Sequence, residues 1–233
     1  MTDGTQEGCS FCEEIVEPRR VSLPLVADFF RQFGRESRVL LDDPEFFVVP
    51  TLGPLVAGHI LILPKTHFYS VGEMPESMLS RLEQIARNVR EILRARYGSC
   101  SAFEHGCVDK IGKAGACIDH AHLHLLPVSQ NLRPLVERSF GSGTEMKSFS
   151  GLRSFVRRSM PYLYYEDPAG LAMAYEAPIA PSQYFRQLMT ATVRGNGDWD
   201  WKRDIGVATV IETYEALKRP LTEAEDSVLA VQQ

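Results

Sequence analysis

Hydrophobic residues form two different patterns along the chain, a helical spacing and a continuous run. Between residues 76 and 97, apolar side chains recur every three or four positions, Arg and Glu fill most of the rest, and Gly98 follows. This spacing predicts a long helix with one buried face that ends at a glycine C-cap. Residues 60–63 form a continuous apolar run that follows His59 and ends at Pro64, which predicts a buried strand at 59–63.

Shorter segments around these two predict further elements. Residues 38–41 and 46–49 flank an Asp-Asp-Pro-Glu turn and predict a hairpin, residues 23–33 predict a short helix, and residues 100–104 and 119–127 predict two more strands. The order of three strands, a helix and two strands favours an antiparallel sheet with the long helix packed on one face. We therefore predict the α+β fold class.

The pattern is weaker after residue 131. The elements expected there are a hairpin and two helices, at 162–165 with 173–176, at 182–193 and at 205–217. Pro220 is expected to end the last helix, because proline disfavours helical backbone in the residue before it. These elements predict an α/β extension.

Composition excludes some classes of protein. The 233 residues are 44% hydrophobic and 24% charged, which is typical of a folded chain and not of a disordered one. Lys and Arg number 25 against 30 Asp and Glu, and this net charge of −5 argues against non-specific binding to nucleic acid or membrane. Residues 1–8 are polar and lack a targeting pattern, so we expect a cytoplasmic protein.

Residues suited to metal binding or nucleophilic chemistry lie in the first half. The six histidines fall between His59 and His124, and the five cysteines fall between Cys9 and Cys117. The pair Cys9-x-x-Cys12 indicates either a metal knuckle or a redox pair.

A run of alternating histidines is the most specific feature. In His120-Ala121-His122-Leu123-His124, three imidazoles share one face of the predicted strand, because side chains alternate along a strand. Each buried imidazole needs partners for two ring nitrogens, so three in a row make purely structural histidines a weaker explanation. A metal site built from these three residues alone is the stronger rival to a catalytic role.

Three motifs together resemble the histidine-triad (HIT) superfamily of nucleotide hydrolases and nucleotidyl transferases. They are the triad followed by two apolar residues, the Gly-His-apolar-Pro-Lys-x-His strand at 58–67, and Cys9-x-x-Cys12 with Phe11 between the cysteines. The resemblance implies a HIT-like fold, in the zinc-bearing prokaryotic type, for residues 9–130. We expect residues 1–8 to be a disordered tail and residues 131–233 to pack on this domain or on a partner in a homodimer.

The resemblance assigns catalytic roles to the triad. It implies that His122 attacks the α-phosphorus of a nucleotide and forms a nucleotidyl-histidine intermediate. His124 is then expected to bind the phosphoryl oxygens, and the carbonyl of His120 to orient the His122 ring.

The resemblance also implies a structural zinc ion. Its ligands in this sequence are Cys9, Cys12, His67 and His120, which complete a tetrahedral Cys₂His₂ shell. The alternative is a plain CxxC pair without metal, with His67 as a solvated residue at a strand end.

Substrate contacts are expected from residues around the triad. His59 and His105 match the pocket rim, Lys113 lies in the loop before the triad, and Thr51 stands where the family carries a ribose-binding Asp or Asn. Thr51 lacks the two carboxylate oxygens that accept a pair of ribose hydroxyls. The loop sequence Gly115-Ala116-Cys117 also lacks the amide and hydroxyl of the family's pattern.

In the extension, Gln183 and Arg186 are candidates for phosphate binding. They lie three positions apart and so share one face of the predicted helix, and arginine binds phosphate through two parallel hydrogen bonds. A solvated helix face is the simpler alternative.

The resemblance, together with the triad, implies a nucleotide hydrolase that cleaves a phosphoanhydride or a phosphoramidate. The expected substrate is a nucleotide or dinucleoside polyphosphate, with no nucleic-acid or membrane partner. Two alternatives remain open. One is a nucleotidyltransferase or phosphorylase that uses the same intermediate, and the other is a zinc-stabilised binding module without turnover.

Overall fold

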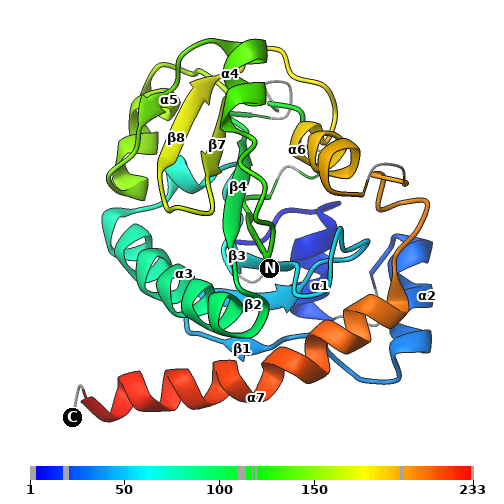
Figure 1. Cartoon of the computed structure of the whole chain (residues 1–233). Coiled ribbons are helices and arrows are strands. Elements are labelled where there is room, and N and C mark those ends of the chain that lie inside the picture. The colour runs from blue at the N-terminus through cyan, green and yellow to red at the C-terminus, as the bar shows by residue number, and fades with distance from the viewer. Residues whose placement is uncertain are drawn as a thin grey trace.

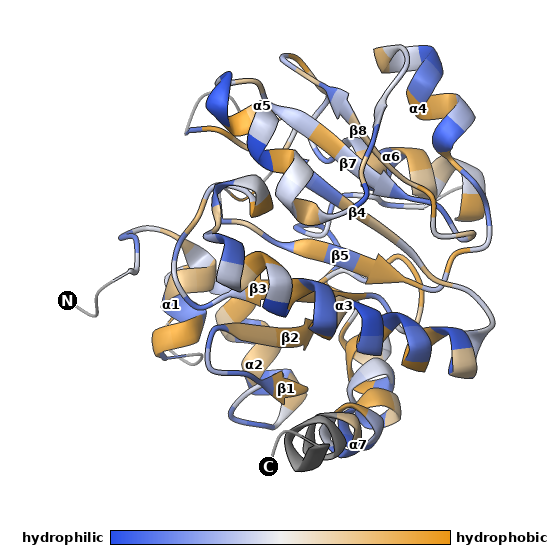
Figure 2. Cartoon of the chain, turned by 90° about the vertical axis from the view of Figure 1, so that its left-hand side faces the viewer, coloured by the Kyte–Doolittle hydropathy of each residue, from blue (hydrophilic) through white to orange (hydrophobic). Residues whose placement is uncertain are grey.

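The strands of the chain pair into an antiparallel sheet. The computed structural model describes residues 4–17, 21–109, 114–116, 118, 120–194 and 197–231, without the side chains of 194 and 225–231. Within these residues, eight strands pair in the order β1-β2-β3-β5-β4-β7-β8-β6. Figures 1 and 2 together label all of these strands except β6. They are β1 (Leu41–Asp42), β2 (Phe46–Pro50), β3 (Ile60–Pro64), β4 (Ser101–Gly106), β5 (Leu123–Leu126), β6 (Thr144–Glu145), β7 (Tyr162–Glu166) and β8 (Ala172–Glu176). The predicted α+β class and both predicted hairpins are confirmed.

Helices cover both faces of this sheet. The α-helices are α1 (Ser10–Val16), α2 (Pro24–Phe33), α3 (Glu76–Tyr97), α4 (Arg133–Phe140), α5 (Arg153–Arg157), α6 (Tyr184–Met189) and α7 (Val207–Val231). Short turns of 3-10 helix occur at Val71–Glu73 and Phe149–Leu152, and a π-helical turn at Thr190–Arg194 follows α6. Among the described residues, none of these helices combines the length and apolarity that crossing a membrane needs.

The α3 helix packs on one face, as its periodicity predicts. Its apolar stripe joins Leu123 and Leu125 of β5 in the main core, and the helix lies in front of the sheet in Figure 2. Gly98 ends the helix with φ 85°, and its N–H donates to the carbonyl of Arg94 at 2.9 Å. Each fully buried leucine of the stripe stabilises the fold by about 1.5–3 kcal/mol.

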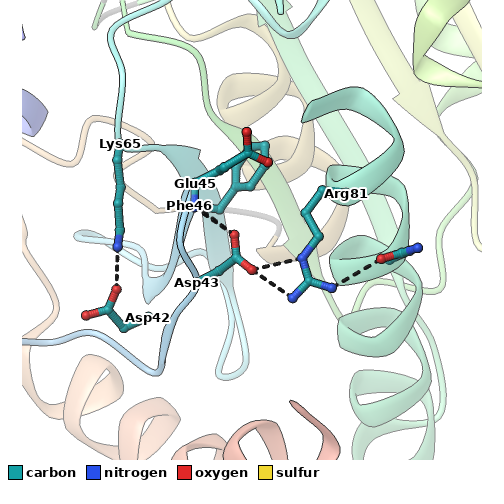
Figure 3. A network of polar contacts seen from close by, with 7 residues as sticks. Asp42, Asp43, Glu45, Phe46, Lys65 and Arg81 are labelled. Carbon is teal, nitrogen blue, oxygen red and sulfur yellow. Dashed lines mark hydrogen bonds and ion pairs between the residues drawn. The ribbon is translucent and has the colours of Figure 1, made fainter. Parts of the chain in front are cut away.

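Asp43 fixes the turn between β1 and β2 and ties it to α3 (Figure 3). Its Oδ1 accepts hydrogen bonds from the N–H groups of Glu45 at 2.9 Å and Phe46 at 3.2 Å. Its Oδ2 accepts from Nε of Arg81 at 2.8 Å, and the carboxylate is only 2% exposed. An aspartate that closes its own turn explains why Asp-Pro-Glu forms a tight hairpin here.

The extension continues the sheet of the first half. Strand β7 pairs with β4 over the register Ala102↔Glu166 to Gly106↔Tyr162. Alternate residues of β7 face opposite cores, since Tyr162 packs on the α3 side and Leu163 on the α6 side. A Cβ atom on Gly106 would lie 2.2 Å from the Tyr162 ring, so this position requires glycine.

The prediction that Pro220 ends the last helix is wrong. Helix α7 continues through Pro220 to Val231. Leu217 and Leu221 on either side are both buried in the main core, and Nζ of Lys218 donates to the carbonyls of Val39 and Leu40 at 3.1 and 3.0 Å. These tertiary contacts outweigh the one backbone hydrogen bond that proline removes.

Two predicted elements have different bounds from those expected. Strand β5 covers only Leu123–Leu126, because the preceding Ala121 donates its N–H to the carbonyl of Phe68 at 2.7 Å instead of joining the ladder. The helix expected over 182–193 is α6 with its π-helical turn, and its N-cap is Gln183 with φ 54° rather than Ser182.

A buried carboxyl group connects β4 to the extension. Glu104 accepts hydrogen bonds from the N–H of Val71 at 2.6 Å and from the hydroxyl of Tyr162 at 2.8 Å, and it is 1% exposed. Burial raises the pKa of Glu104 to about 7, although both hydrogen bonds oppose the shift. Tyr162 and Tyr164 are the other titratable groups whose pKa values respond to this carboxyl group, and both are raised well above the usual tyrosine value, mainly by burial.

This group should make the stability of the protein depend on pH. The folded pKa of Glu104 lies above its ordinary value of 4.5, so its contribution is fully present below pH 4.5 and is lost as pH rises through about 7. The free energy of unfolding should fall by roughly 3 kcal/mol over this range. Glu104→Gln keeps an acceptor for the N–H of Val71 and should remove this decline in stability. Urea denaturation of the wild type and of Glu104→Gln between pH 5 and pH 8 measures the difference. Identical pH profiles for the two proteins would contradict the assignment.

Candidate active site and metal site

A pocket lies on the face of the sheet opposite α3. The triad, the N-terminal helix and the extension all contribute to its wall. The lining residues are Ser10, Phe11, Glu14, Val26, Arg38, Thr51, Leu52, Leu61, His105, Ile118, His122, His124, Gln183, Arg186 and Trp201. Its mostly apolar walls with a few polar groups are typical of small-molecule sites.

The His122 ring is held by one hydrogen bond to the backbone. Its Nδ1 lies 2.6 Å from the carbonyl oxygen of His120. A carbonyl only accepts, so Nδ1 carries the proton and Nε2 keeps its lone pair. Burial lowers the pKa of His122 to about 4, although the His120 carbonyl opposes the shift, so the ring is neutral at pH 7. A neutral imidazole with a free Nε2 in a pocket is suited to nucleophilic attack.

The tautomer of His124 is fixed through His59. The N–H of Leu55 donates to Nδ1 of His59 at 3.3 Å, and Nε2 of His59 lies 2.9 Å from Nδ1 of His124. The first bond leaves the proton of His59 on Nε2, which therefore donates to His124 and leaves the proton of His124 on Nε2. Burial lowers the pKa values of both histidines well below the usual range, so both rings are neutral.

The sheet supports the ring of His124 from both sides. In the register of the sheet, His124 lies between Leu61 of β3 and Phe103 of β4. The rings of Phe103 and His124 stack with centroids 4.1 Å apart and an interplanar angle of 14°. Strand alternation turns Leu123 and Leu125 into the core beneath α3, so His124 faces the pocket.

His105 lines the pocket from the end of β4. Its Nε2 accepts a hydrogen bond from the N–H of Phe185 at 3.4 Å, so a neutral His105 carries its proton on Nδ1. Burial lowers its pKa to about 3. The pocket therefore contains three neutral imidazoles, from His105, His122 and His124.

Of the other predicted substrate contacts, three line the pocket and one lies outside the described residues. Thr51 is buried in the pocket wall, where its hydroxyl donates to the carbonyl of Leu52 at 3.3 Å. Gln183 and Arg186 also line the pocket, so the alternative of a solvated helix face is wrong for them. Lys113 lies outside the described residues.

An ion pair in the pocket wall was missed from the sequence. Glu14 of α1 accepts from Nε and Nη2 of Arg38 at 2.6 and 2.8 Å, and Arg38 is 1% exposed. Nη1 of Arg38 donates to the carbonyl of Pro50. No local spacing signals this pair, because Glu14 and Arg38 are 24 residues apart in the sequence.

Four potential metal ligands gather beside the pocket. One ligand atom from each of Cys9, Cys12, His67 and His120 lies within 4.8 Å of the others. Nδ1 of His120 is 3.6 Å from Sγ of Cys9 and 3.5 Å from Sγ of Cys12, and Nδ1 of His67 is 3.4 Å from Sγ of Cys12. Zinc bonds of about 2.3 Å to sulfur and 2.0–2.1 Å to nitrogen in a tetrahedron place these atoms about 3.6 Å apart.

The ring of His120 is oriented for such a role. Its Nε2 lies 2.9 Å from the carbonyl oxygen of Pro64, so Nε2 carries the proton and Nδ1 turns its lone pair toward the cysteines. Cys9 and Cys12 are buried at the start of α1, and Phe11 between them contacts both His120 and His122, with ring centroids 5.7 and 5.4 Å apart. The candidate metal site and the candidate nucleophile are therefore joined by one short helix.

Two curated proteins resemble part of this chain. The chain is 27% identical over 89 residues to the nitrilase and fragile histidine triad fusion protein NitFhit of Caenorhabditis elegans. These 89 residues cover 38% of this chain and 20% of that protein. It is 26% identical over 99 residues to the asymmetrical bis(5'-nucleosyl)-tetraphosphatase of Schizosaccharomyces pombe. These 99 residues cover 42% of this chain and 53% of that protein. The chain thus spans about half or less of the length of these two relatives.

Solved structures include a zinc-bound histidine triad family protein from Mycobacterium smegmatis. The likeness has 16% identity and a TM-score of 0.36, and covers 65% of this chain and 92% of that one. A family model described as HIT domain matches residues 32–131, which include His59, His67 and the triad but neither Cys9, Cys12 nor the extension. Residues 32–131, less than half of this chain, therefore match the HIT domain family.

Proposed function

We propose that the chain is a nucleotide hydrolase that forms a nucleotidyl-histidine intermediate on His122. It cleaves a phosphoanhydride or phosphoramidate at the α-phosphate. The observation that carries this proposal is the 2.6 Å hydrogen bond from Nδ1 of His122 to the carbonyl of His120, which leaves Nε2 unprotonated in the wall of a pocket. The HIT domain and the tetraphosphatase among the relatives support the same class of reaction.

In the proposed reaction, each step exchanges one bond at phosphorus. Nε2 of His122 attacks the α-phosphorus in line, a P–N bond forms, and the bond to the leaving group breaks with its electron pair. Water then attacks the same phosphorus, and the electron pair of the P–N bond returns to Nε2. One proton of the water ends on the leaving group, so one water is consumed in each turnover.

The neighbouring residues stabilise charge in these steps. The carbonyl of His120 accepts from Nδ1 and so favours the positive charge that develops on His122 during attack. The N–H at Nε2 of His124, fixed through His59, is a donor for the phosphoryl oxygens. Because this donor is oriented before the substrate binds, it needs no reorganisation in the transition state.

We further propose that Cys9, Cys12, His67 and His120 bind one structural zinc ion. The donor set and the distances fit a tetrahedral Cys₂His₂ site, and four protein ligands leave no position for a substrate. The ion would tie α1 to the triad and would not take part in the reaction. A homodimeric assembly and a cytoplasmic location stay predictions.

Removal of the nucleophile should abolish the intermediate. His122→Ala should lower kcat at least about 10³-fold with any accepted nucleotide, because no other group forms the P–N bond. His122→Gly leaves room for free imidazole, which should restore part of the turnover. Acid-quenched samples with labelled diadenosine tetraphosphate should contain a protein-bound nucleotide in the wild type and not in His122→Ala. Protein-bound label in His122→Ala would contradict the assignment of His122 as the nucleophile.

The two tautomers give a test that does not depend on turnover. Near pH 7, long-range ¹H–¹⁵N NMR spectra should show His122 as the Nδ1–H tautomer and His124 as the Nε2–H tautomer. His59→Phe removes the donor to His124 and should change the spectrum of His124 but leave the Nδ1–H signal of His122. The reverse tautomer on His122 would be incompatible with the proposed attack.

The zinc proposal predicts a metal content of about one ion per chain. Cys12→Ser should lose most of the zinc and lower Tm by roughly 10 °C, since a structural ion contributes several kcal/mol and each kcal/mol is worth about 2–4 °C. Cys100→Ala is the matched control, because Cys100 is buried in the main core and lies outside the four-residue cluster. Elemental analysis and thermal unfolding measure both effects. If the purified wild type contains no zinc, and neither added zinc nor a chelator changes its Tm, then Cys9 and Cys12 are a pair without a metal ion.

A further inference from the structure

Three residues of the extension, Gln183, Arg186 and Trp201, line the pocket of His122. Gln183 and Arg186 lie beyond the matched HIT domain at 32–131, yet both line the same pocket as His122 and His124. They are 4% and 5% exposed. The inference drawn from them rests on the proposed hydrolase function and concerns the group that leaves.

Gln183 is held in an unusual conformation at the start of α6. Its φ of 54° is left-handed, which is uncommon for a residue other than glycine. Its N–H donates to the carbonyl of Gly115 at 2.6 Å, and its Nε2 donates to Oδ1 of Asp200 at 3.2 Å. The buried Oε1 has no hydrogen-bond partner in the described part of the chain. A buried acceptor without a partner is costly unless a ligand supplies a donor.

Arg186 brings a fixed positive charge to the same pocket. Its Nε donates to the carbonyl of Trp199 at 2.8 Å, and its Nη2 donates to the carbonyl of Gly53. Two bonds to the main chain hold the guanidinium plane in one orientation. The pocket that Arg186 lines is also lined by His105, His122 and His124.

The two groups differ in what they can bind. A guanidinium binds phosphate oxygens, while an amide oxygen accepts from a hydroxyl or N–H group. A ligand that satisfies both carries an anionic phosphate with a hydroxyl-bearing group next to it. Ammonia or a simple amine as a leaving group offers no anion for Arg186.

We propose that Arg186 and Gln183 form a subsite for a phosphate-bearing leaving group, with Arg186 on its phosphate and Oε1 of Gln183 on an adjacent hydroxyl. The preferred substrate is then a nucleotidyl group joined by a phosphoanhydride to a second phosphate ester, such as a nucleoside or sugar phosphate. When His122 attacks, the bond from the α-phosphorus to the bridging oxygen breaks. The electron pair stays on the leaving phosphate, whose added negative charge Arg186 stabilises.

The test compares two substrates that share the adenylyl group. Diadenosine tetraphosphate has a phosphate-bearing leaving group with hydroxyls, and adenosine 5'-phosphoramidate releases ammonia. Arg186→Met should lower kcat/KM for the tetraphosphate about 100-fold or more, and for the phosphoramidate by less than about 5-fold. Arg157→Met is the matched control, because Arg157 is exposed on α5 and does not line the pocket. Equal losses on both substrates mean that Arg186 only supports the loops of Gly53 and Trp199, and overturn the subsite.

A binding measurement separates the subsite from catalysis. Inorganic tripolyphosphate should bind the wild type and His122→Ala about equally, and should bind Arg186→Met at least about 10-fold more weakly. Gln183→Glu, which keeps Arg186 and adds negative charge beside it, should also weaken binding. Tripolyphosphate binding without any nucleotidyl adduct supports the subsite but rejects the proposed hydrolase. Phosphoramidate hydrolysis without tripolyphosphate binding rejects the subsite and supports the hydrolase.

Added inorganic phosphate distinguishes a leaving phosphate from an incoming one. If the subsite takes the leaving group, phosphate should inhibit turnover of the tetraphosphate and the phosphoramidate should still yield AMP. Formation of ADP from the phosphoramidate, reduced in Arg186→Met, would show that the subsite takes an attacking phosphate and overturn its assignment to the leaving group.

Discussion

The backbone at His120 connects the two sites of this protein. The ring of His120 lies among the cysteines of α1, and its carbonyl orients the ring of His122. Any rotation of this one residue would move a candidate metal ligand and the acceptor for the nucleophile together. The bonds from Nε2 of His120 to Pro64 and from the N–H of Ala121 to Phe68 hold the segment in place. The position of the nucleophile therefore depends on the packing of the N-terminal helix.

The pocket is built to keep its histidines neutral. Each ring that faces it accepts a hydrogen bond at one nitrogen or donates one to a carbonyl, so the tautomers are set by neighbours and not by solvent. Burial disfavours a proton on any of these rings, and the nearby guanidinium of Arg186 disfavours it further. A site of this kind carries its positive charge on an arginine, which leaves the imidazoles available as nucleophile and donors.

The sequence allowed the first half to be predicted better than the second, for physical reasons. The helix at 76–97 has one buried face and therefore a clear period, and the alternation at 120–124 follows from the geometry of a strand. Strand β7 is buried on both faces and pairs with a strand far away in sequence, so no local pattern identifies its partner. The reach of Arg186 into the pocket depends on the same non-local pairing, and the continuation of α7 past Pro220 depends on tertiary contacts.

The pairing of β7 with β4 also determines how the sheet meets its surroundings. In the described residues, the outermost strands are β1 and β6, each of only two residues. Unpaired strand edges are where other chains add by backbone hydrogen bonds, and short edges offer few groups for this. By occupying the long edge of β4, the extension leaves little backbone for edge-to-edge aggregation. In the described residues, a second copy of the chain would find only these two-residue edges on which to lengthen the sheet.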